Sequence, residues 1–270
     1  HVSLDRRIPD RYTQLVSDGA PRINKRTYSA LLRRSLAFYA QERLTDERGN
    51  PFIIAAHHEE WAQKVQTGRN VAICAARGHG KSFFCTMAYS LWMAERNPNG
   101  EGLIFSSSED QAKKRLEKVI HQVESNPRLA HLLPDKRNRR MWGALGIRLA
   151  NGFTIRVKGY GSKARGDHPE FIVLDDVMND NTAFSDDVRK KEIQYFRQAV
   201  KPMLKSYSQL LFIGTPMCRG DLLMTLLEDE TFESGTYPAV VEEDGVERAL
   251  WPDMYPLEYL LEEKKSSGAL

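Results

Sequence analysis

The chain has 270 residues, of which 41% are hydrophobic and 28% are charged, so it can bury a large core as one α/β domain or as one domain with an extra lobe. Its formal net charge of +3 is too small to indicate nucleic-acid binding by itself. No apolar run is long enough to cross a bilayer, and the N-terminus lacks the features of a signal peptide. The three cysteines, Cys74, Cys85 and Cys218, form no C-x-x-C pair, which favours reduced thiols in a cytoplasmic protein over a disulfide framework or a zinc site.

The N-terminal part of the chain predicts two helices, then a strand, a turn and another helix. Residues 1–26 are polar, rich in Arg and Pro, and expected to be loosely ordered. Apolar residues recur at helical spacing over 27–44, and a second helix is expected around 57–66. An apolar strand at 71–76 leads into a turn, and a long apolar helix follows that turn.

The turn at 77–82, Arg-Gly-His-Gly-Lys-Ser, is typical of a loop that binds the phosphates of a nucleotide. It matches the pattern G-x-x-x-x-G-K-[ST] except that Ala75 replaces the first glycine. Gly78 and Gly80 can take positive φ and let the backbone approach a phosphate, and the helix that starts near Lys81 directs unpaired N–H groups to the same place. A Gly-Lys-Ser tripeptide also occurs by chance, but here the strand before it and the helix after it supply the context that the motif requires.

The side chains of this turn have expected tasks. Lys81 would place its charge on the β- and γ-phosphates and take part in catalysis, and the Ser82 hydroxyl would reach a bound Mg²⁺. Arg77 and His79 complete the nucleotide contacts of the loop, and Arg77 is also a candidate partner of Asp176. A nucleoside triphosphate and Mg²⁺ are therefore the expected ligands of the loop.

The middle of the chain predicts a strand at 103–107, a helix and a hairpin. Ser108 and Gln111 form a capping box, and the helix after them has one apolar face. Asn-Gly between the alternating apolar residues of 147–157 is a β-hairpin signal. Basic side chains of this region could contact DNA phosphates, although a solvated charged surface is the commoner explanation for each taken singly: Lys113, Lys114, Lys118, Lys136, Arg137, Arg139 and Arg140.

Two more buried strands are predicted at 171–176 and 209–216, with a helix from about residue 185 between them. Their apolar residues are continuous rather than alternating, which is typical of parallel strands that are covered on both faces. We therefore predict an α/β fold of the P-loop NTPase kind, with a mostly parallel sheet, helices on both of its faces and an added β-hairpin.

The strand at 171–176 ends in two carboxylates and matches the hhhhDE pattern of P-loop ATPases of the additional-strand catalytic-glutamate type, with Asp in place of the final Glu. We expect Asp175 to hold Mg²⁺, usually through water, and Asp176 to orient and deprotonate the attacking water. Asp is one methylene shorter than Glu, so the identity of the catalytic base stays open. The alternative is a strand that runs into an acidic turn, because 179–181 is turn-like.

Two further segments contain candidate nucleotide contacts. The loop at 159–167 is rich in Gly and carries Lys163 and Arg165, so Arg165 could reach a γ-phosphate in this subunit or in a neighbouring one, and a solvated loop is the alternative. Gly-Thr-Pro at 214–216 ends the last predicted strand. The Thr215 hydroxyl could sense the γ-phosphate, or the segment could be a simple strand-terminating turn.

Together these motifs resemble the ATPase domain of the large terminase subunit of tailed bacteriophages, over roughly residues 50–265. The phosphate loop with its internal Arg77, the Gly- and Arg-bearing loop, the acidic strand and the segment 212–216 each resemble a motif of that family. The segment 52–61, which contains His57, His58 and Trp61, resembles the part of the family that packs near the adenine, and Leu250-Trp-Pro resembles the close of its domain.

The resemblance implies a fold, an activity and partners. It implies ATP hydrolysis that drives double-stranded DNA into a procapsid, at the portal in the host bacterial cytoplasm, with the portal protein and the small terminase subunit as partners. It implies a ring of subunits during packaging, in which Arg165 acts as an arginine finger across subunits, and leaves open whether the isolated chain is a monomer. No membrane partner is expected. Residues 1–50 would form an N-terminal helical or extended segment and 51–265 the ATPase domain, and a metal-dependent nuclease domain, with the nuclease activity, is expected after residue 270.

Two other interpretations compete with this one. Another nucleic-acid-dependent P-loop ATPase, such as a helicase-like motor, would need paired motor domains or a strand-separating element, and the chain contains one phosphate loop. A nucleotide-binding switch with little turnover would make Asp176 and Arg165 structural residues. A phosphate-release assay distinguishes the switch from the motors.

Overall fold

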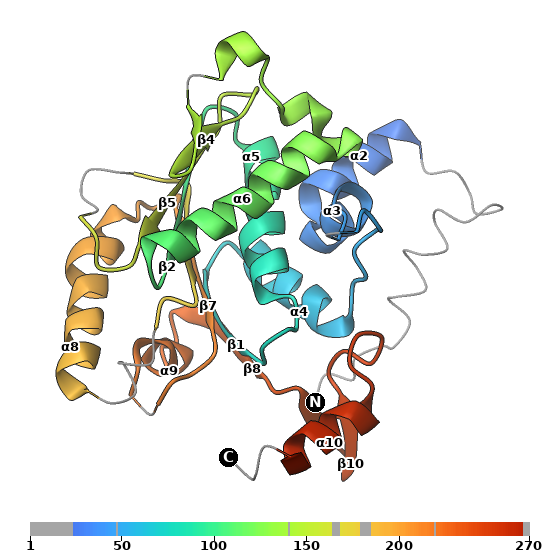
Figure 1. Ribbon diagram of the computed structural model, residues 1–270, viewed down its shortest axis with the longest axis vertical. Coiled ribbons are helices and arrows are strands. Elements are labelled where there is room, and N and C mark those ends of the chain that lie inside the picture. The colour runs from blue at the N-terminus through green and yellow to red at the C-terminus, as the bar shows by residue number, and fades with distance from the viewer. Residues whose placement is uncertain are drawn as a thin grey trace.

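A central eight-stranded sheet organises the protein (Figure 1). The computed structural model describes residues 24–46, 48–139, 141–163, 168–178, 185–218 and 220–266. The sheet has the strand order β3-β4-β5-β2-β6-β7-β1-β8, and β9 and β10 form a separate antiparallel pair. The strands are β1 (Asn70–Ala75), β2 (Glu101–Ser106), β3 (Trp142–Gly143), β4 (Gly146–Arg148), β5 (Thr154–Gly159), β6 (Phe171–Asp175), β7 (Gln209–Gly214), β8 (Phe232–Tyr237), β9 (Val240–Glu243) and β10 (Val246–Ala249).

Most of the sheet is parallel, as the continuous apolar runs predict. All neighbouring strands from β5 to β8 in the sheet order pair in parallel, while β3, β4 and β5 pair antiparallel. The pairing of β4 with β5 places Arg148 opposite Thr154, so the hairpin predicted at 147–157 is confirmed. Strand β7 lies between β1 and β6, and β7 is the extra strand that defines the additional-strand class of P-loop ATPases. The predicted fold class is confirmed.

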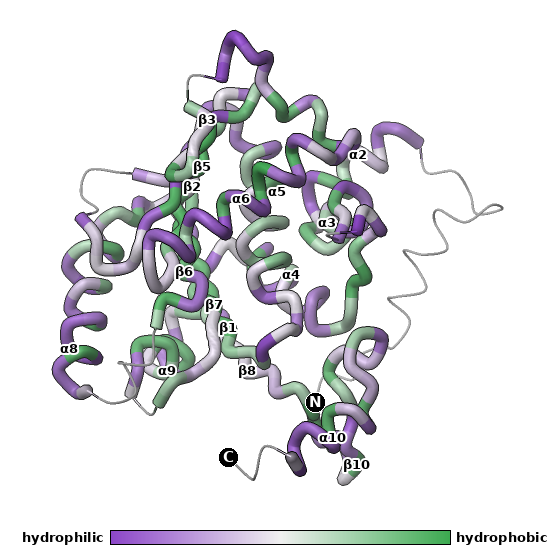
Figure 2. Tube along the Cα trace, in the orientation of Figure 1, coloured by the Kyte–Doolittle hydropathy of each residue, from purple (hydrophilic) through white to green (hydrophobic). Residues whose placement is uncertain are grey.

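Helices cover both faces of the sheet. In Figure 1, α3 to α6 lie on one side of it and α8 and α9 lie on the other. Within β6, Phe171 and Val173 pack into the core of the first face, and Ile172 and Leu174 pack into the core of the second. Figure 2 shows the same arrangement as apolar central strands between more polar outer elements. The helices are α2 (Lys25–Arg34), α3 (Leu36–Arg43), α4 (Ala56–Gln66), α5 (Tyr89–Arg96), α6 (Glu109–Ser125), α8 (Asp186–Tyr195), α9 (Leu222–Leu227) and α10 (Leu257–Ser266).

Several helix boundaries follow from side-chain caps that the sequence shows. The Ser108 hydroxyl accepts a hydrogen bond from the Gln111 N–H at the start of α6, and the Ser185 hydroxyl accepts one from the Val188 N–H at the start of α8. The helix expected over 27–44 is instead divided, because Ser35 is extended and caps α3 through the N–H of Phe38. No described helix is both long and apolar enough to span a bilayer.

Two helical segments differ from the regular helices that the sequence predicts. Ser82–Ala88 is a π-helix that continues into α5, and Phe196–Val200 is another that continues α8. A π-helical turn directly after a phosphate loop fits the frequent occurrence of such turns at functional sites. The hydrophobic period in the sequence does not reveal it, because α- and π-helical turns bury nearly the same residues.

Segments near both ends of the described chain, α2 and α3 at one end and Trp251 at the other, pack against the same core as the sheet. The indole N–H of Trp92 in α5 donates to the Leu32 carbonyl of α2 at 3.0 Å, and Leu36 of α3 is fully buried. Near the other end, Trp251 is buried against α4. The predicted division of the chain at residue 50 stays a prediction, and the loosely ordered segment expected at 1–26 lies almost wholly outside the described residues.

Candidate nucleotide site

The predicted phosphate loop connects β1 to the π-helical segment Ser82–Ala88. Gly78 and Gly80 both have φ of +80°, the left-handed region that other residues rarely adopt. A Cβ atom at Gly78 would lie 2.3 Å from the Tyr255 hydroxyl, and one at Gly80 would lie 2.5 Å from Nε2 of His58. Both glycines are therefore required by backbone conformation and by close packing on the outer side of the loop. Ala75, in place of the first glycine of the motif, is the last residue of β1 and takes an ordinary strand conformation.

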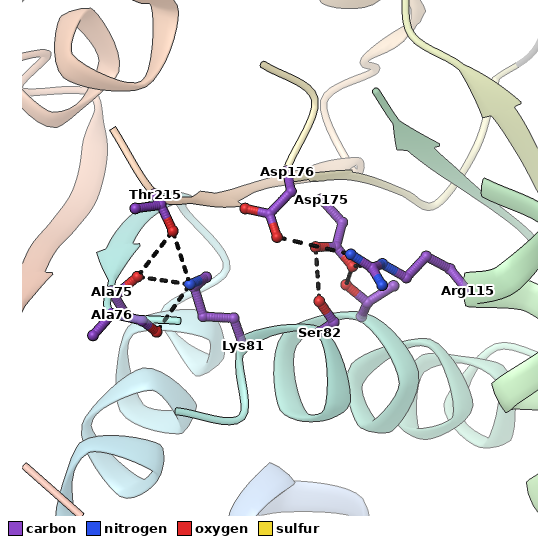
Figure 3. A network of polar contacts seen from close by, with 9 residues as sticks. Ala75, Ala76, Lys81, Ser82, Arg115, Asp175, Asp176 and Thr215 are labelled. Atoms are coloured by element: carbon purple, nitrogen blue, oxygen red, sulfur yellow. Dashed lines mark hydrogen bonds and ion pairs between the residues drawn. The ribbon is translucent and has the colours of Figure 1, made fainter. Parts of the chain in front are cut away.

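Lys81 lies at the centre of the site, with most of its surface buried. Its ammonium group donates to the carbonyls of Ala75 at 2.6 Å and Ala76 at 3.0 Å, and to the Thr215 hydroxyl at 3.2 Å (Figure 3). Burial lowers the pKa of Lys81, and the nearby carboxylates of Asp176 and Asp175 oppose this shift. Because β7 adjoins β1, Thr215 lies beside the phosphate loop, and its contact with a γ-phosphate stays a prediction.

Asp175 is fully buried at the end of β6, and both of its oxygens are engaged. Oδ1 accepts from the Ser82 hydroxyl at 2.9 Å, and Oδ2 accepts from the Thr86 hydroxyl at 2.9 Å. Nε of Arg115 lies 2.8 Å from Oδ2, in an orientation that makes an ion pair rather than an aligned hydrogen bond. Burial raises the pKa of Asp175, while the charge of Arg115 and the two hydroxyls oppose that rise.

Asp176 follows β6 and has a side chain that is 43% exposed. Its φ of +48° is left-handed, and its N–H donates to the Ile213 carbonyl at 3.0 Å. Asp and Asn tolerate this conformation better than residues with longer side chains, because their short polar groups can bond locally. The backbone conformation thus offers a physical reason for Asp rather than Glu at this position. Nη2 of Arg115 lies 3.7 Å from Asp176 Oδ2, so one guanidinium group faces both carboxylates.

Arg115 is the residue of this site that sequence reasoning missed. It lies on α6, which the sequence shows only as a helix with one apolar and one charged face. The structure places Gln111, Arg115 and Lys118 along one cavity, at positions i, i+4 and i+7 of the helix. This polar stripe beside the buried residues Leu116 and Val119 is the signal that could have indicated a second charged face.

These groups surround a cavity of about 740 Å³ at the C-terminal ends of β2, β6, β7 and β1. In a parallel α/β sheet this edge is where ligands bind. The polar residues that line it include Arg77, Lys81, Ser82, Ser106, Ser107, Gln111, Arg115, Lys118, Asp175, Asp176 and Thr215. Apolar side chains, among them Phe83, Met178 and Met217, complete the wall. The volume lies in the range of small-molecule sites.

Two predicted nucleotide contacts, Trp61 and His79, do not line this cavity, and a third, Arg165, stays a prediction. Trp61 is fully buried beside His57, His58 and Phe84 and does not line the cavity, so its predicted packing against adenine has no support from this geometry. The ring of His79 does not line the cavity and packs at a tilt against Tyr255, at 5.0 Å between ring centres. The candidate finger Arg165 lies outside the described residues.

The donor set is suitable for Mg²⁺ held together with phosphates. The described residues contain no group of three or more His, Cys, Asp or Glu side chains that could hold a metal by themselves. Mg²⁺ in such sites is bound through one or two oxygen ligands of the protein plus water and substrate phosphates. The Ser82 hydroxyl and the Asp175 carboxylate, joined at 2.9 Å, are hard oxygen ligands of that kind beside the phosphate loop.

The strand order, the phosphate loop and the acidic end of β6 together define a P-loop ATPase fold of the additional-strand class. Over 188 residues, or 67% of this chain, the sequence is 26% identical to the large terminase subunit of Enterobacteria phage T3, and the match covers 29% of that protein. The chain thus spans less than a third of the length of this relative. The predicted resemblance to large terminase subunits is confirmed by this sequence match.

Solved structures show the same fold. The crystal structure of the HK97 bacteriophage large terminase matches with a TM-score of 0.60 and 17% identity, over 78% of this chain and 44% of that one. A variant of the large terminase ATPase domain of Thermus phage P74-26 matches with a TM-score of 0.53 and 18% identity, over 80% of this chain and 89% of that one. No protein-family model matches the sequence.

Proposed function

We propose that the chain hydrolyses ATP with Mg²⁺ and is the motor domain of a machine that packages double-stranded viral DNA into a procapsid. One observation carries the hydrolysis: Lys81, the joined pair of Ser82 and Asp175, and the half-exposed Asp176 line the same cavity. These are the groups that phosphoryl transfer needs, namely a phosphate cradle, a metal site and a carboxylate near the γ-phosphate.

The chain's own residues have distinct tasks in this reaction. The amides of the phosphate loop and Lys81 bind the triphosphate, and Lys81 exchanges its carbonyl partners for phosphate oxygens. Ser82 and Asp175 hold Mg²⁺, which when bound neutralises charge on the phosphates. Asp176 orients the attacking water and takes its proton, and Thr215 contacts both the phosphate end of the cavity and Lys81. Arg77 lines the cavity and contacts the phosphates, and Arg165 supplies the finger across subunits.

The sequence match to a large terminase subunit supports the motor role. By this match we also propose double-stranded DNA, a portal protein and a small terminase subunit as partners. The subunits would act as a ring at the portal in the host bacterial cytoplasm. A nuclease domain would follow residue 270. The basic residues of α6 do not carry the DNA proposal, because Lys118 lines the nucleotide cavity and Lys113 pairs with Glu109 at 2.7 Å.

Substitution of Lys81 tests the hydrolysis. We expect Lys81→Ala to reduce phosphate release from ATP at least about 100-fold, as for loss of other transition-state donors, with an unchanged circular-dichroism spectrum. Lys113→Ala is the matched control, since that lysine pairs with Glu109 and Asp110 on the surface of α6 and does not line the cavity. Turnover of Lys81→Ala at the wild-type rate would contradict the site. Tight ATP binding by the wild type without phosphate release, with DNA and Mg²⁺ present, would favour the switch instead.

A further inference from the structure

The outer side of the phosphate loop, opposite the cavity, is held by two histidines of α4. The carbonyl of His79 points away from the cavity and towards this helix. Nε2 of His57 lies 3.2 Å from the carbonyl oxygen, and Nε2 of His58 lies 3.3 Å from the same oxygen. A carbonyl oxygen has two lone pairs and can accept both hydrogen bonds.

The tautomers of both rings follow from their partners. The N–H of Ala55 donates to Nδ1 of His58 at 3.0 Å, so Nδ1 carries no proton and Nε2 carries the N–H of the neutral ring. His58 therefore donates to the His79 carbonyl, and His57 also donates there, because a carbonyl oxygen can only accept. Burial keeps both rings neutral, since it lowers the pKa of His57 to about 4 and places the pKa of His58 well below its usual value.

The direction of this carbonyl fixes the direction of the next amide. The C=O and N–H of one planar trans peptide point in opposite directions. Because the His79 carbonyl faces α4, the N–H of Gly80 faces the opposite side, where Gly80 lines the nucleotide cavity. In the described chain this N–H donates no hydrogen bond to another residue. A buried pair of imidazoles thus determines where a phosphate-binding donor points.

The fit between loop and histidines is tight. A Cβ atom at Gly80 would come within 2.5 Å of Nε2 of His58, so the ring and the loop approach as closely as a glycine allows. Trp251 packs edge-on against both rings, at 5.7 Å from His57 and 4.8 Å from His58 between ring centres. The rings are 3% and 0% exposed and do not line the cavity, so they contact the loop backbone rather than a nucleotide base.

We propose that His57 and His58 are positioning residues that hold the His79–Gly80 peptide with its N–H directed at the bound triphosphate. The inference rests on the proposed function of the cavity as a nucleotide site. It assigns the pair a task in the geometry of the loop, separate from any contact with adenine.

The test compares two substitutions at one position. His57→Gln keeps an N–H donor at the place of Nε2, and His57→Leu keeps the bulk without the donor. We expect His57→Leu to raise the dissociation constant of a fluorescent ATP analogue with Mg²⁺ about three- to tenfold, the scale of one lost hydrogen bond, and His57→Gln to stay within about twofold of wild type. Hydrogen exchange of the 76–82 peptide, measured without nucleotide, should be faster in His57→Leu alone.

Trp61→Phe is the control for simple loss of packing, since Trp61 contacts both rings but not the loop. We expect it to lower the melting temperature and to leave the dissociation constant and the loop exchange unchanged. If His57→Leu lowers only the melting temperature, or if His57→Gln weakens binding as much as His57→Leu, the positioning role is wrong. Failure of the wild-type chain to bind the analogue would instead overturn the proposed function, and the inference with it.

Discussion

The two sides of the phosphate loop are built from opposite kinds of group. The cavity side holds charged side chains: the Lys81 ammonium donates to carbonyls and to the Thr215 hydroxyl, and the Arg115 guanidinium faces the carboxylates of Asp175 and Asp176. The outer side holds neutral rings: His57 and His58 donate to one backbone carbonyl, and Phe52 and Trp251 pack against these rings. The phosphate loop, residues 77–82, separates these two environments.

The cavity side therefore supplies the groups for the reaction, and the outer side sets the conformation of the loop. Charged side chains that pair with one another can change partner when a triphosphate arrives, because each exchange replaces one charge-assisted bond by another. Neutral buried rings have no such alternative, so they keep the loop in one conformation. We therefore expect substitutions on the cavity side to alter turnover and the pairing of charges. Substitutions on the outer side should alter the conformation of the loop and the pH dependence of stability.

The largest effect on turnover outside the phosphate loop is expected at Asp176. Asp176→Asn should lower the rate of phosphate release by about 10²–10⁴-fold, the usual contribution of a general base, and leave the affinity for ATP nearly unchanged. Asn also tolerates the φ of +48° found at this position, so the variant should fold normally. Single-turnover kinetics measure the rate, and equilibrium binding measures the affinity.

Asp176→Glu sharpens the same test, because it restores the residue usual at this position and lengthens the side chain by one methylene. If Asp176→Asn hydrolyses ATP as the wild type does, Asp176 is not the base. Strong loss in Asp176→Glu together with loss in Asp176→Asn would show that both the carboxylate and its reach matter.

Arg115 is expected to matter most for stability on the cavity side. Arg115→Met leaves the buried carboxylate of Asp175 without its cation, and breaking a buried pair in this way costs about 3–5 kcal/mol. We expect the lower end, because the side chain of Arg115 is 20% exposed. Burial already raises the pKa of Asp175 in the folded wild type, and without Arg115 it rises further, so the folded variant takes up this proton at higher pH than the folded wild type. The loss of stability should therefore be smallest near pH 4 and grow as the pH rises.

Urea denaturation of Arg115→Met at several pH values measures this loss. Lys114→Met is the control, since Lys114 is the exposed neighbour on α6. Equal stability of the two variants at neutral pH would contradict an energetic role for the ion pair.

On the outer side of the loop, we expect His57 to make the stability of the folded chain depend on pH. Burial lowers the pKa of His57 from 6.5 to about 4, so the unfolded chain takes up a proton at this residue before the folded chain does. Stability from the neutral ring is complete above about pH 6.5 and is lost as the pH falls towards 4, by about 2–3 kcal/mol. His57→Gln cannot titrate and should remove this part of the slope. Denaturation of both proteins between pH 4 and 7 checks it, and parallel curves would mean that His57 is not buried as a neutral ring.

Local sequence patterns were sufficient for most of the fold. Continuous apolar runs such as 171–175 can be buried only between two layers of helices, and the Asn-Gly turn fixes the hairpin of β4 and β5. The phosphate loop and the acidic strand end are likewise local motifs. The ends of parallel strands meet at one sheet edge, which makes Thr215 a candidate for this site, whereas its closeness to Lys81 comes from the strand order of the structure.

What sequence could not supply are contacts between distant segments. Arg115 reaches Asp175 across 60 positions of chain, as their residue numbers show. The polar stripe of α6 indicates a charged face but not which residue that face meets. His57 and His58 were connected with adenine through resemblance, whereas their bonds go to the loop backbone. Both cases depend on the distance and direction between packed elements, which hydrophobic periodicity does not encode.

The smallest effect is expected at Thr215, because its hydroxyl is one of three partners of the Lys81 ammonium group. Thr215→Val keeps the shape and removes the hydroxyl that accepts from Lys81 at 3.2 Å, while two carbonyls still hold the ammonium group. One such bond at a partly exposed residue contributes ~1 kcal/mol, so turnover should fall about fivefold with little change in affinity or melting temperature. Thr225→Val on α9 is the control, because the Thr225 hydroxyl donates to the Asp221 carbonyl and does not line the cavity. A loss as large as that of Lys81→Ala would mean that Thr215 contacts the reacting phosphate itself, whereas no loss would mean that Lys81 is held by the loop carbonyls alone.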